Sequence, residues 1–391
     1  MPNRKVVFAV CSIAFVGALA WRASSVAPAF GDPLPGLTPA QLALFAEGQD
    51  EFQNVEGPDE GLGPVFNGTS CSGCHLSPAV GGTNELVETR FGRTLNGKFD
   101  PMTEFGGSLI QTNGIGASGS CEYAGETVPG EATIVAGRLT TPLFGLGLVD
   151  AVPDASFRFL AALERALSPS TAGRVQLVTD LASSHVVVGK FGWKAQVPNL
   201  FQFSGDAYLN EMGITSPMFP DENCPQGDCN LLVCNTGGVN DADGADVAKF
   251  ANFMRFLAPP PRGRVDDDAR RGEAVFYATG CFSCHAPALR TASHPVAALD
   301  HVTFFPYSDF LLHDMGSLGD GIEQGIATGS EMRTAPLWGV RTRAKLLHDG
   351  RATDLEQAIL AHDGQGKRSR NAFASLDATA KRRLLAFLKS L

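Results

Sequence analysis

The sequence predicts a mainly α-helical protein of two similar units, each of which contains long irregular loops. Its 391 residues are enough for two or three domains, and 44% of them are apolar, as in folded globular proteins. Amphipathic helices open and close each half of the chain, whereas the segments between them are rich in glycine, of which the chain holds 44. The formal charge of −10 argues against a nucleic-acid partner.

The N-terminus has the three parts of an export signal. Basic residues at positions 4 and 5 precede an apolar run from Val6 to Ala20, and small residues follow as far as Ala29. We expect a signal peptide over residues 1–29 and a periplasmic mature protein. An uncleaved N-terminal membrane anchor is the alternative, although the apolar run is shorter than the roughly 20 residues of a spanning helix.

The first half of the chain contains three predicted helices. Thr38 and Pro39 are typical of a helix start, and apolar residues with helical spacing follow them. Residues 154–183 and 246–257 are also predicted to be helical. Residues 57–147 are rich in glycine, asparagine, threonine and serine, which predicts long irregular loops.

A run of three prolines at residues 259–261 is the best candidate for a domain boundary, because proline ends a helix and favours a linker. It divides the mature chain into residues 30–258 and 259–391. The second half repeats the plan of the first, with a predicted opening helix over residues 269–277 and a closing helix over residues 377–391. A glycine and a phenylalanine four positions apart occur in both opening helices.

Two five-residue motifs share the pattern Cys-x-x-Cys-His, one at residues 71–75 and one at residues 281–285. This pattern is typical of c-type haem attachment: each thiol adds to one vinyl group, and the histidine reaches the iron. Local disulfides or one shared zinc ion are the alternatives, but neither explains a histidine directly after both pairs. The sequence therefore predicts two cytochrome c-type domains with two covalently bound haems. The attachment residues are Cys71, Cys74, Cys281 and Cys284, and the iron ligands are His75 and His285.

Four stretches of the chain, the first of which includes the first motif, resemble sequences of the bacterial di-haem cytochrome c peroxidase superfamily. The resemblance is strongest to its di-haem oxidoreductase branch. The four stretches are residues 61–75, 191–215, 310–316 and 333–362. The resemblance implies a peroxidase-like oxidoreductase in which electrons pass from the C-terminal haem to a substrate-binding N-terminal haem. A pure electron-transfer cytochrome and a di-haem oxidase of an organic or protein substrate are the alternatives. It also implies peroxide or another small oxidant as substrate, and a small redox protein as electron donor or acceptor. Relatives also bind calcium between the haems, but no side-chain pattern in this sequence tests for calcium or for a homodimer.

The resemblance places a sixth ligand of the second haem at His362, where relatives carry methionine. Met315 and His348 are competing candidates. Relatives have a histidine about sixteen residues beyond the first motif, and this chain has none there. The first iron is therefore either open to substrate or reached by a remote group such as His185 or Met102.

Three further residues match the catalytic pocket of the superfamily. Trp193 corresponds to a tryptophan that relays electrons between the haems, and Gln202 and Glu211 follow it at similar intervals. A carboxylate is needed there because it can move a proton between the two oxygens of a peroxide. The alternative is a packed aromatic residue and a solvated acid.

Four cysteines remain outside the motifs and the signal. They are Cys121, Cys224, Cys229 and Cys234. In an exported protein four thiols suggest two disulfides, for which three pairings exist. We expect them to staple residues 216–240, which have little core of their own. A redox-active thiol pair is the alternative.

Overall fold

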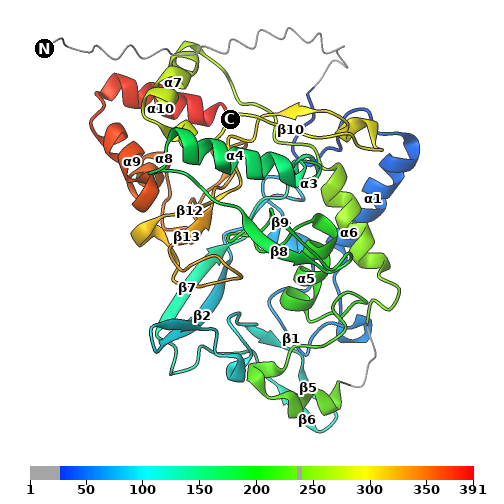
Figure 1. The fold of residues 1–391 in the computed structure, drawn as a ribbon. Helices are drawn as coiled ribbons and strands as arrows, with labels where there is room; N and C mark the ends of the chain where they lie inside the picture. Colours follow the sequence, from blue (N-terminus) through cyan, green and yellow to red (C-terminus); the bar gives the residue numbers. More distant parts are fainter. Residues whose placement is uncertain (1–26, 236–239) are drawn as a thin grey trace, which may run out of the picture.

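The computed structural model describes residues 27–235 and 240–391 (Figure 1). The expected signal peptide over residues 1–29 lies outside the described residues, apart from its last three positions. No helix within the two described ranges is both long enough and apolar enough to cross a membrane.

Helices and short strands alternate along the whole chain. The helices are α1 (Pro39–Gln53), α2 (Cys71–Cys74), α3 (Leu146–Asp150), α4 (Asp154–Leu167), α5 (Leu200–Met212), α6 (Ala245–Phe256), α7 (Asp267–Ala278), α8 (Leu355–Leu360), α9 (Lys367–Ala374) and α10 (Ala378–Lys389). The strands are β1 (Val65–Phe66), β2 (Val87–Leu95), β3 (Lys98–Asp100), β4 (Asn113–Gly114), β5 (Gly116–Ser118), β6 (Cys121–Tyr123), β7 (Ile134–Leu139), β8 (Gln176–Asp180), β9 (His185–Gly189), β10 (Leu289–Arg290), β11 (Thr303–Phe304), β12 (Leu312–Asp314) and β13 (Glu331–Arg333).

The prediction of a mainly α-helical fold is wrong. The structure is 36% helical and 17% strand, so it is a mixed α/β fold with several small antiparallel sheets. The longest pairing joins β2 to β7, with β3 on the other edge of β2, and runs through the segment predicted to be irregular loops (Figure 1). Main-chain pairing satisfies the backbone groups of these glycine-rich segments, which have too few apolar side chains for helices with a buried face.

The predicted helix over residues 154–183 is also too long. Helix α4 ends at Leu167, and residues 176–189 form the hairpin of β8 and β9. The valines of this hairpin are β-branched, which favours strands over helices. The run of β-branched residues over 176–189 is therefore the sequence feature that distinguishes this hairpin from a continuation of the helix.

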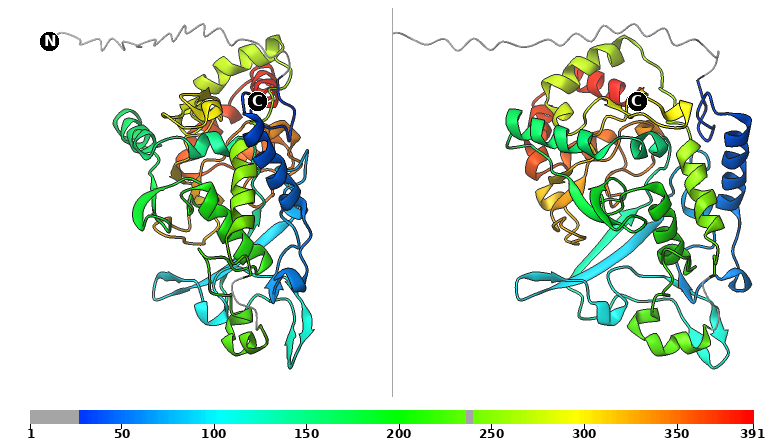
Figure 2. Two further views of the ribbon diagram at one scale, coloured as in Figure 1. Left: turned by 90° about the vertical axis from the view of Figure 1, so that its right-hand side faces the viewer. Right: turned by 45° about the vertical axis from the view of Figure 1, so that its right-hand side comes forward.

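Two helix pairs repeat the same arrangement in the two halves of the chain. Helix α1 packs on α6, and α7 packs on α10 (Figure 1 and Figure 2). The four predicted helix segments are confirmed here to within two residues at most ends. Gly48 and Gly272 lie at the two crossings, where a Cβ would overlap the carbonyl oxygens of Lys249 and Arg383. The repeated glycine thus allows close helix contact, and the repeated phenylalanines, Phe52 and Phe276, are buried beside it.

We expect Gly272→Ala to lower the free energy of unfolding by about 1–3 kcal/mol, because the added methyl group forces α7 away from α10. Chemical denaturation followed by circular dichroism measures the change. Gly130→Ala is the matched control, since nothing lies within 4 Å of a Cβ at Gly130. Equal stabilities for the two variants would show that the crossing tolerates a side chain.

The largest hydrophobic cluster joins residues of both halves. It includes Phe253 and Leu257 from the first half and Leu299, Phe310 and Trp338 from the second. The two predicted units therefore share a buried interface. At the far end of the first half, Cys121 pairs with Cys234 and Cys224 with Cys229, which fits the expected stapling of this region.

Candidate functional site

Each Cys-x-x-Cys-His motif lines a cavity of its own. Cys71, Cys74 and His75 line the first cavity, of about 240 Å³. Cys281, Cys284 and His285 line the second, of about 190 Å³, together with many apolar side chains. None of the four cysteines is in a disulfide. Both pairs of thiols are therefore free to react with a group that occupies the cavity beside them.

The two motif histidines are held in the same way. Nδ1 of His75 donates to the carbonyl oxygen of Gly82 at 3.1 Å, and Nδ1 of His285 donates to that of Tyr307 at 2.9 Å. Burial lowers the pKa of each imidazole to about 4, so both are neutral at pH 7. A neutral histidine that donates through Nδ1 keeps the lone pair of Nε2 free, which is the usual state of a metal ligand.

The lining of the cavities agrees with the group that the motifs predict. Both cavities are partly open to solvent, and most of the surface that lines each of them is apolar. A large apolar group with two thiol attachment points and one nitrogen ligand fits this chemistry, and haem is such a group.

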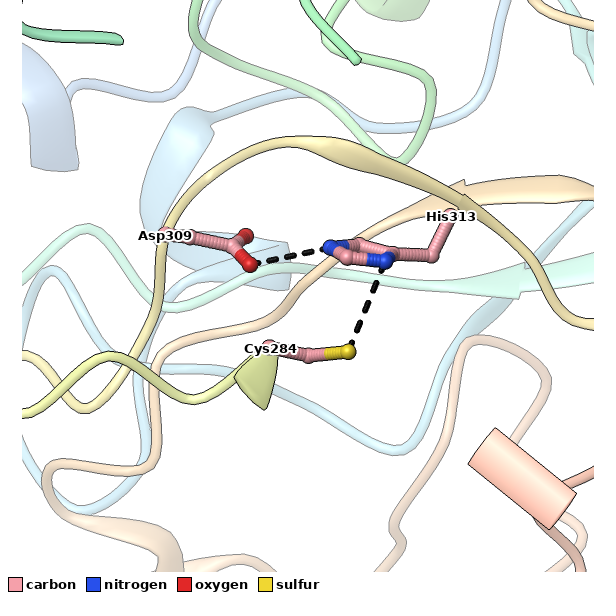
Figure 3. A group of neighbouring side chains, drawn as sticks. All are labelled: Cys284, Asp309 and His313. Atoms are coloured by element: carbon pink, nitrogen blue, oxygen red, sulfur yellow. Dashed lines mark hydrogen bonds and ion pairs between the residues drawn. The ribbon is translucent and has the colours of Figure 1, made fainter. Parts of the chain in front are cut away.

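A buried cluster lies beside the second motif (Figure 3). Nδ1 of His313 lies 3.4 Å from Sγ of Cys284, and Nε2 lies 2.9 Å from Oδ2 of Asp309. Asp309 raises the pKa of His313 well above its usual value. Gly173 packs so closely on His313 that a Cβ there would lie 2.6 Å from Nε2. Because both ring nitrogens are engaged, His313 holds the attachment thiol in place and is not free to bind iron.

All three candidates for the sixth ligand of the second iron line the second cavity. They are His362, Met315 and His348. His362, at the end of α8, donates through Nδ1 to the carbonyl oxygen of Ala358 at 2.8 Å, which leaves Nε2 free. The ring of His348 packs edge-on against Trp193, with 6.2 Å between the ring centroids.

The first cavity has no second histidine. All eight histidines of the chain lie within the described residues, and His75 alone among them lines this cavity. His185 is exposed at the start of strand β9, and Met102 is buried in a separate cluster with Phe91 and Ile110. The structure therefore brings neither remote candidate to the first cavity, although two other methionines, Met212 and Met254, line it.

Trp193 lies between the two cavities and lines both of them. Its indole Nε1 donates to the carbonyl oxygen of Leu139 at 2.8 Å, which orients the ring. Among the described residues, Trp193 is the one that lines both cavities. Its large aromatic ring is held in one orientation by the hydrogen bond to Leu139.

Glu211, in the last turn of α5, lines the first cavity. Nδ2 of Asn67 donates to its Oε2 at 2.9 Å. Burial and the nearby charge of Glu88 raise the pKa of Glu211 to about 8, although Arg90 and the hydrogen bond from Asn67 oppose the shift. At pH 7 this carboxyl group therefore keeps its proton inside the cavity.

Gln202 does not reach either cavity. It is nine positions before Glu211 on the same helix, so the two side chains point in roughly opposite directions, about 180° apart. The Gln202 amide accepts from the backbone N–H of Leu181 at 3.0 Å and donates to the carbonyl oxygen of Thr179 at 3.3 Å. Its role in the structure is to tie α5 to the β8–β9 hairpin.

Charged side chains on β2 and β7 complete the first cavity, and sequence reasoning missed them. Glu88 and Arg90 on β2 form an ion pair, and Arg138 on β7 binds Asp320 at 2.7 Å. The sequence feature that indicates these residues is the alternation of charged and other side chains over residues 87–95, a segment predicted above to be an irregular loop. Once β2 is recognised as a strand, residues 88 and 90 share one face of it.

Comparisons with known proteins found one matching family and several solved structures that the chain resembles. Residues 126–391 match the family described as "Di-haem oxidoreductase, putative peroxidase". No curated protein matches the chain. Solved structures that resemble it include hydrazine synthase from Kuenenia stuttgartiensis, with 14% identity over 100% of both chains. A MauG-like protein associated with microbial copper homeostasis shares 16% identity over 96% of this chain and 95% of its own. The diheme peroxidase BthA from Burkholderia thailandensis shares 14% identity over 89% and 86%. The TM-score is 0.40 in each case.

Proposed function

Because the chain belongs to the di-haem oxidoreductase family, we propose that it is a periplasmic c-type cytochrome that reduces peroxide, with residues 30–258 and 259–391 each holding one haem. The observation that carries this proposal is the pair of cavities with Trp193 between them and a protonated Glu211 in one of them. Bound haem supplies electron storage and an iron centre for cleavage of an O–O bond.

The geometry of the cavities supports the attachment residues that the motifs predict. Cys71 and Cys74 would hold the first haem and Cys281 and Cys284 the second, while Nε2 of His75 and of His285 would bind the irons. His362 would be a second protein ligand for the second haem, which suits electron transfer. The first haem would be the one that meets the substrate, because no second histidine lines its cavity.

The proton chemistry belongs to Glu211. Asn67 donates to Oε2, and the protonated carboxyl group also shares a hydrogen bond with Glu88. Glu211 would give its proton to one oxygen of the peroxide as the O–O bond breaks, so that this oxygen leaves as water, while two electrons from the donor protein and one further proton convert the other oxygen to water. Trp193 provides the aromatic contact through which electrons pass from the second cavity to the first.

The electron donor is a small redox protein with a basic surface. The net charge of −10, made more negative by the haem carboxylates, favours such a partner. Screening confines this attraction to roughly 8 Å at physiological ionic strength.

Electron paramagnetic resonance of the oxidised protein tests the proposed function, together with absorption spectra after addition of peroxide. We expect one high-spin and one low-spin iron, and a spectral change of the high-spin haem with peroxide. Two low-spin irons that do not respond to peroxide would instead identify a pure electron carrier.

We expect His362→Met to raise the reduction potential of the low-spin haem and to change its resonance signature, because methionine stabilises the reduced iron relative to histidine. A redox titration followed by absorbance measures the potential. His185→Met is the control, since His185 is exposed on β9. A signature that survives in His362→Met but is lost in Met315→Leu would assign the ligand to Met315.

A further inference from the structure

Five arginines line the two cavities, and they fall into two groups by their partners. Three are paired with carboxylates: Arg90 with Glu88, Arg138 with Asp320, and Arg370 with Asp363. The other two, Arg333 and Arg343, have no carboxylate within 4.0 Å among the described residues. A guanidinium group removed from water is costly unless an anion accompanies it, so the second group needs a partner.

Protein groups accept hydrogen bonds from only some of the nitrogen atoms of each unpaired guanidinium. In Arg333, Nε donates to the carbonyl oxygen of Gly192 at 2.6 Å and Nη1 to that of Thr334 at 3.2 Å. In Arg343, Nη2 donates to the carbonyl oxygen of Pro336 at 3.0 Å. Nη2 of Arg333 and both Nε and Nη1 of Arg343 have no hydrogen-bond partner in the described part of the chain. These free donors suit the two oxygens of a carboxylate.

The two arginines stand where the cavities approach each other. Both line the second cavity, and both also line a small space of about 30 Å³ that Trp193 borders. Burial lowers the pKa of each guanidinium to about 10, and the like charge of Arg343 adds to the shift at Arg333. Both remain protonated at pH 7. The charge of Asp309 opposes part of the shift at Arg333, but no described carboxylate lies within 4.0 Å of either guanidinium.

We propose that Arg333 and Arg343 form a carboxylate-binding site that receives a propionate of the haem attached to Cys281 and Cys284. This inference rests on the proposed function, because it requires haem in the second cavity. The arginines neutralise the carboxylate in a buried position and fix the edge of the ring beside Trp193. Their charges also disfavour a calcium ion at this wall.

The test uses the exported holoprotein with haem labelled with ¹³C at the propionates. Oxidised-minus-reduced infrared difference spectra report the labelled carboxylate bands, and a redox titration reports the potential of each haem. Arg343→Gln is expected to shift one labelled band and to lower the potential of one haem, since a positive charge near the iron favours the reduced state. Arg343→Lys keeps the charge and loses the fork, so it restores the potential and leaves the band shifted.

Arg370→Gln is the matched control, because Arg370 lines the same cavity but is paired with Asp363. It is expected to leave the labelled bands in place. Unchanged bands in both Arg343 variants would overturn the inference. A second outcome would also overturn it: acetate binds saturably to the wild type and not to Arg343→Gln, while the propionate bands do not move in that variant. The site would then bind a free carboxylate and not a haem propionate. Mass spectrometry of the wild type separates this failure from that of the proposed function, which fails if two haems are not attached.

Discussion

Glu211→Gln is expected to lower kcat for peroxide reduction by about 100- to 10,000-fold while both haems stay attached, because the amide cannot deliver the proton to the leaving oxygen. Stopped-flow measurement of peroxide consumption with a reduced electron donor gives the rate. The change is nearly isosteric, and Asn67 can still reach the side chain. We therefore expect little change in the free energy of unfolding.

The same residue predicts the pH dependence of the wild type. Burial and Glu88 raise the pKa of Glu211 to about 8, so the proton-donating form dominates below that pH. The rate is expected to fall as the pH rises through about 8, and this fall is expected to be absent in Glu211→Gln. Glu122→Gln on the exposed strand β6 is the control for a changed acid elsewhere. Full turnover in Glu211→Gln would assign the proton transfer to another group.

Replacing both cysteines of one motif by serine is expected to remove one covalently attached haem. For Cys71→Ser with Cys74→Ser, the mass of the denatured protein falls by that of one haem. If haem is also lost from the cavity of about 240 Å³, the midpoint of thermal unfolding falls, because the apolar lining loses the group that fills it. Mass spectrometry and thermal unfolding measure the two effects.

Variants of the other cysteine pairs test whether haem loss is specific to the replaced motif or follows from the loss of any two cysteines. Cys281→Ser with Cys284→Ser is expected to remove the second haem, whereas Cys224→Ser with Cys229→Ser opens a local disulfide and keeps both haems. Two attached haems in the Cys71→Ser with Cys74→Ser variant would contradict the prediction.

Local signals predicted the helices better than the strands. The opening and closing helices of both halves have clear apolar spacing and end at caps or prolines, and the structure confirms them. Strand β2 is hard to predict because it has few apolar residues, and both β2 and β7 are stabilised by pairing with a partner about 45 positions away. Main-chain pairing of this kind leaves a weak trace in a single sequence.

Spacing along the chain was a poor guide to which side chains meet. Gln202 and Glu211 follow Trp193 at suitable intervals, but the helix between them turns Gln202 away from the cavity. The sequence gives no sign of where Arg343 lies, since no neighbouring residue in the chain indicates that its side chain lines the same small space as Trp193.

The sequence by itself predicts covalent haem attachment, because each Cys-x-x-Cys-His motif brings two thiols and an imidazole together within five residues. Tertiary structure alone decided what surrounds each haem cavity. Glu88 lies near Glu211, and Arg138 binds Asp320, across more than 100 residues of chain. Such contacts depend on how strands and helices pack. They set the pKa of Glu211, leave Arg333 and Arg343 without a carboxylate, and place Trp193 between the two cavities.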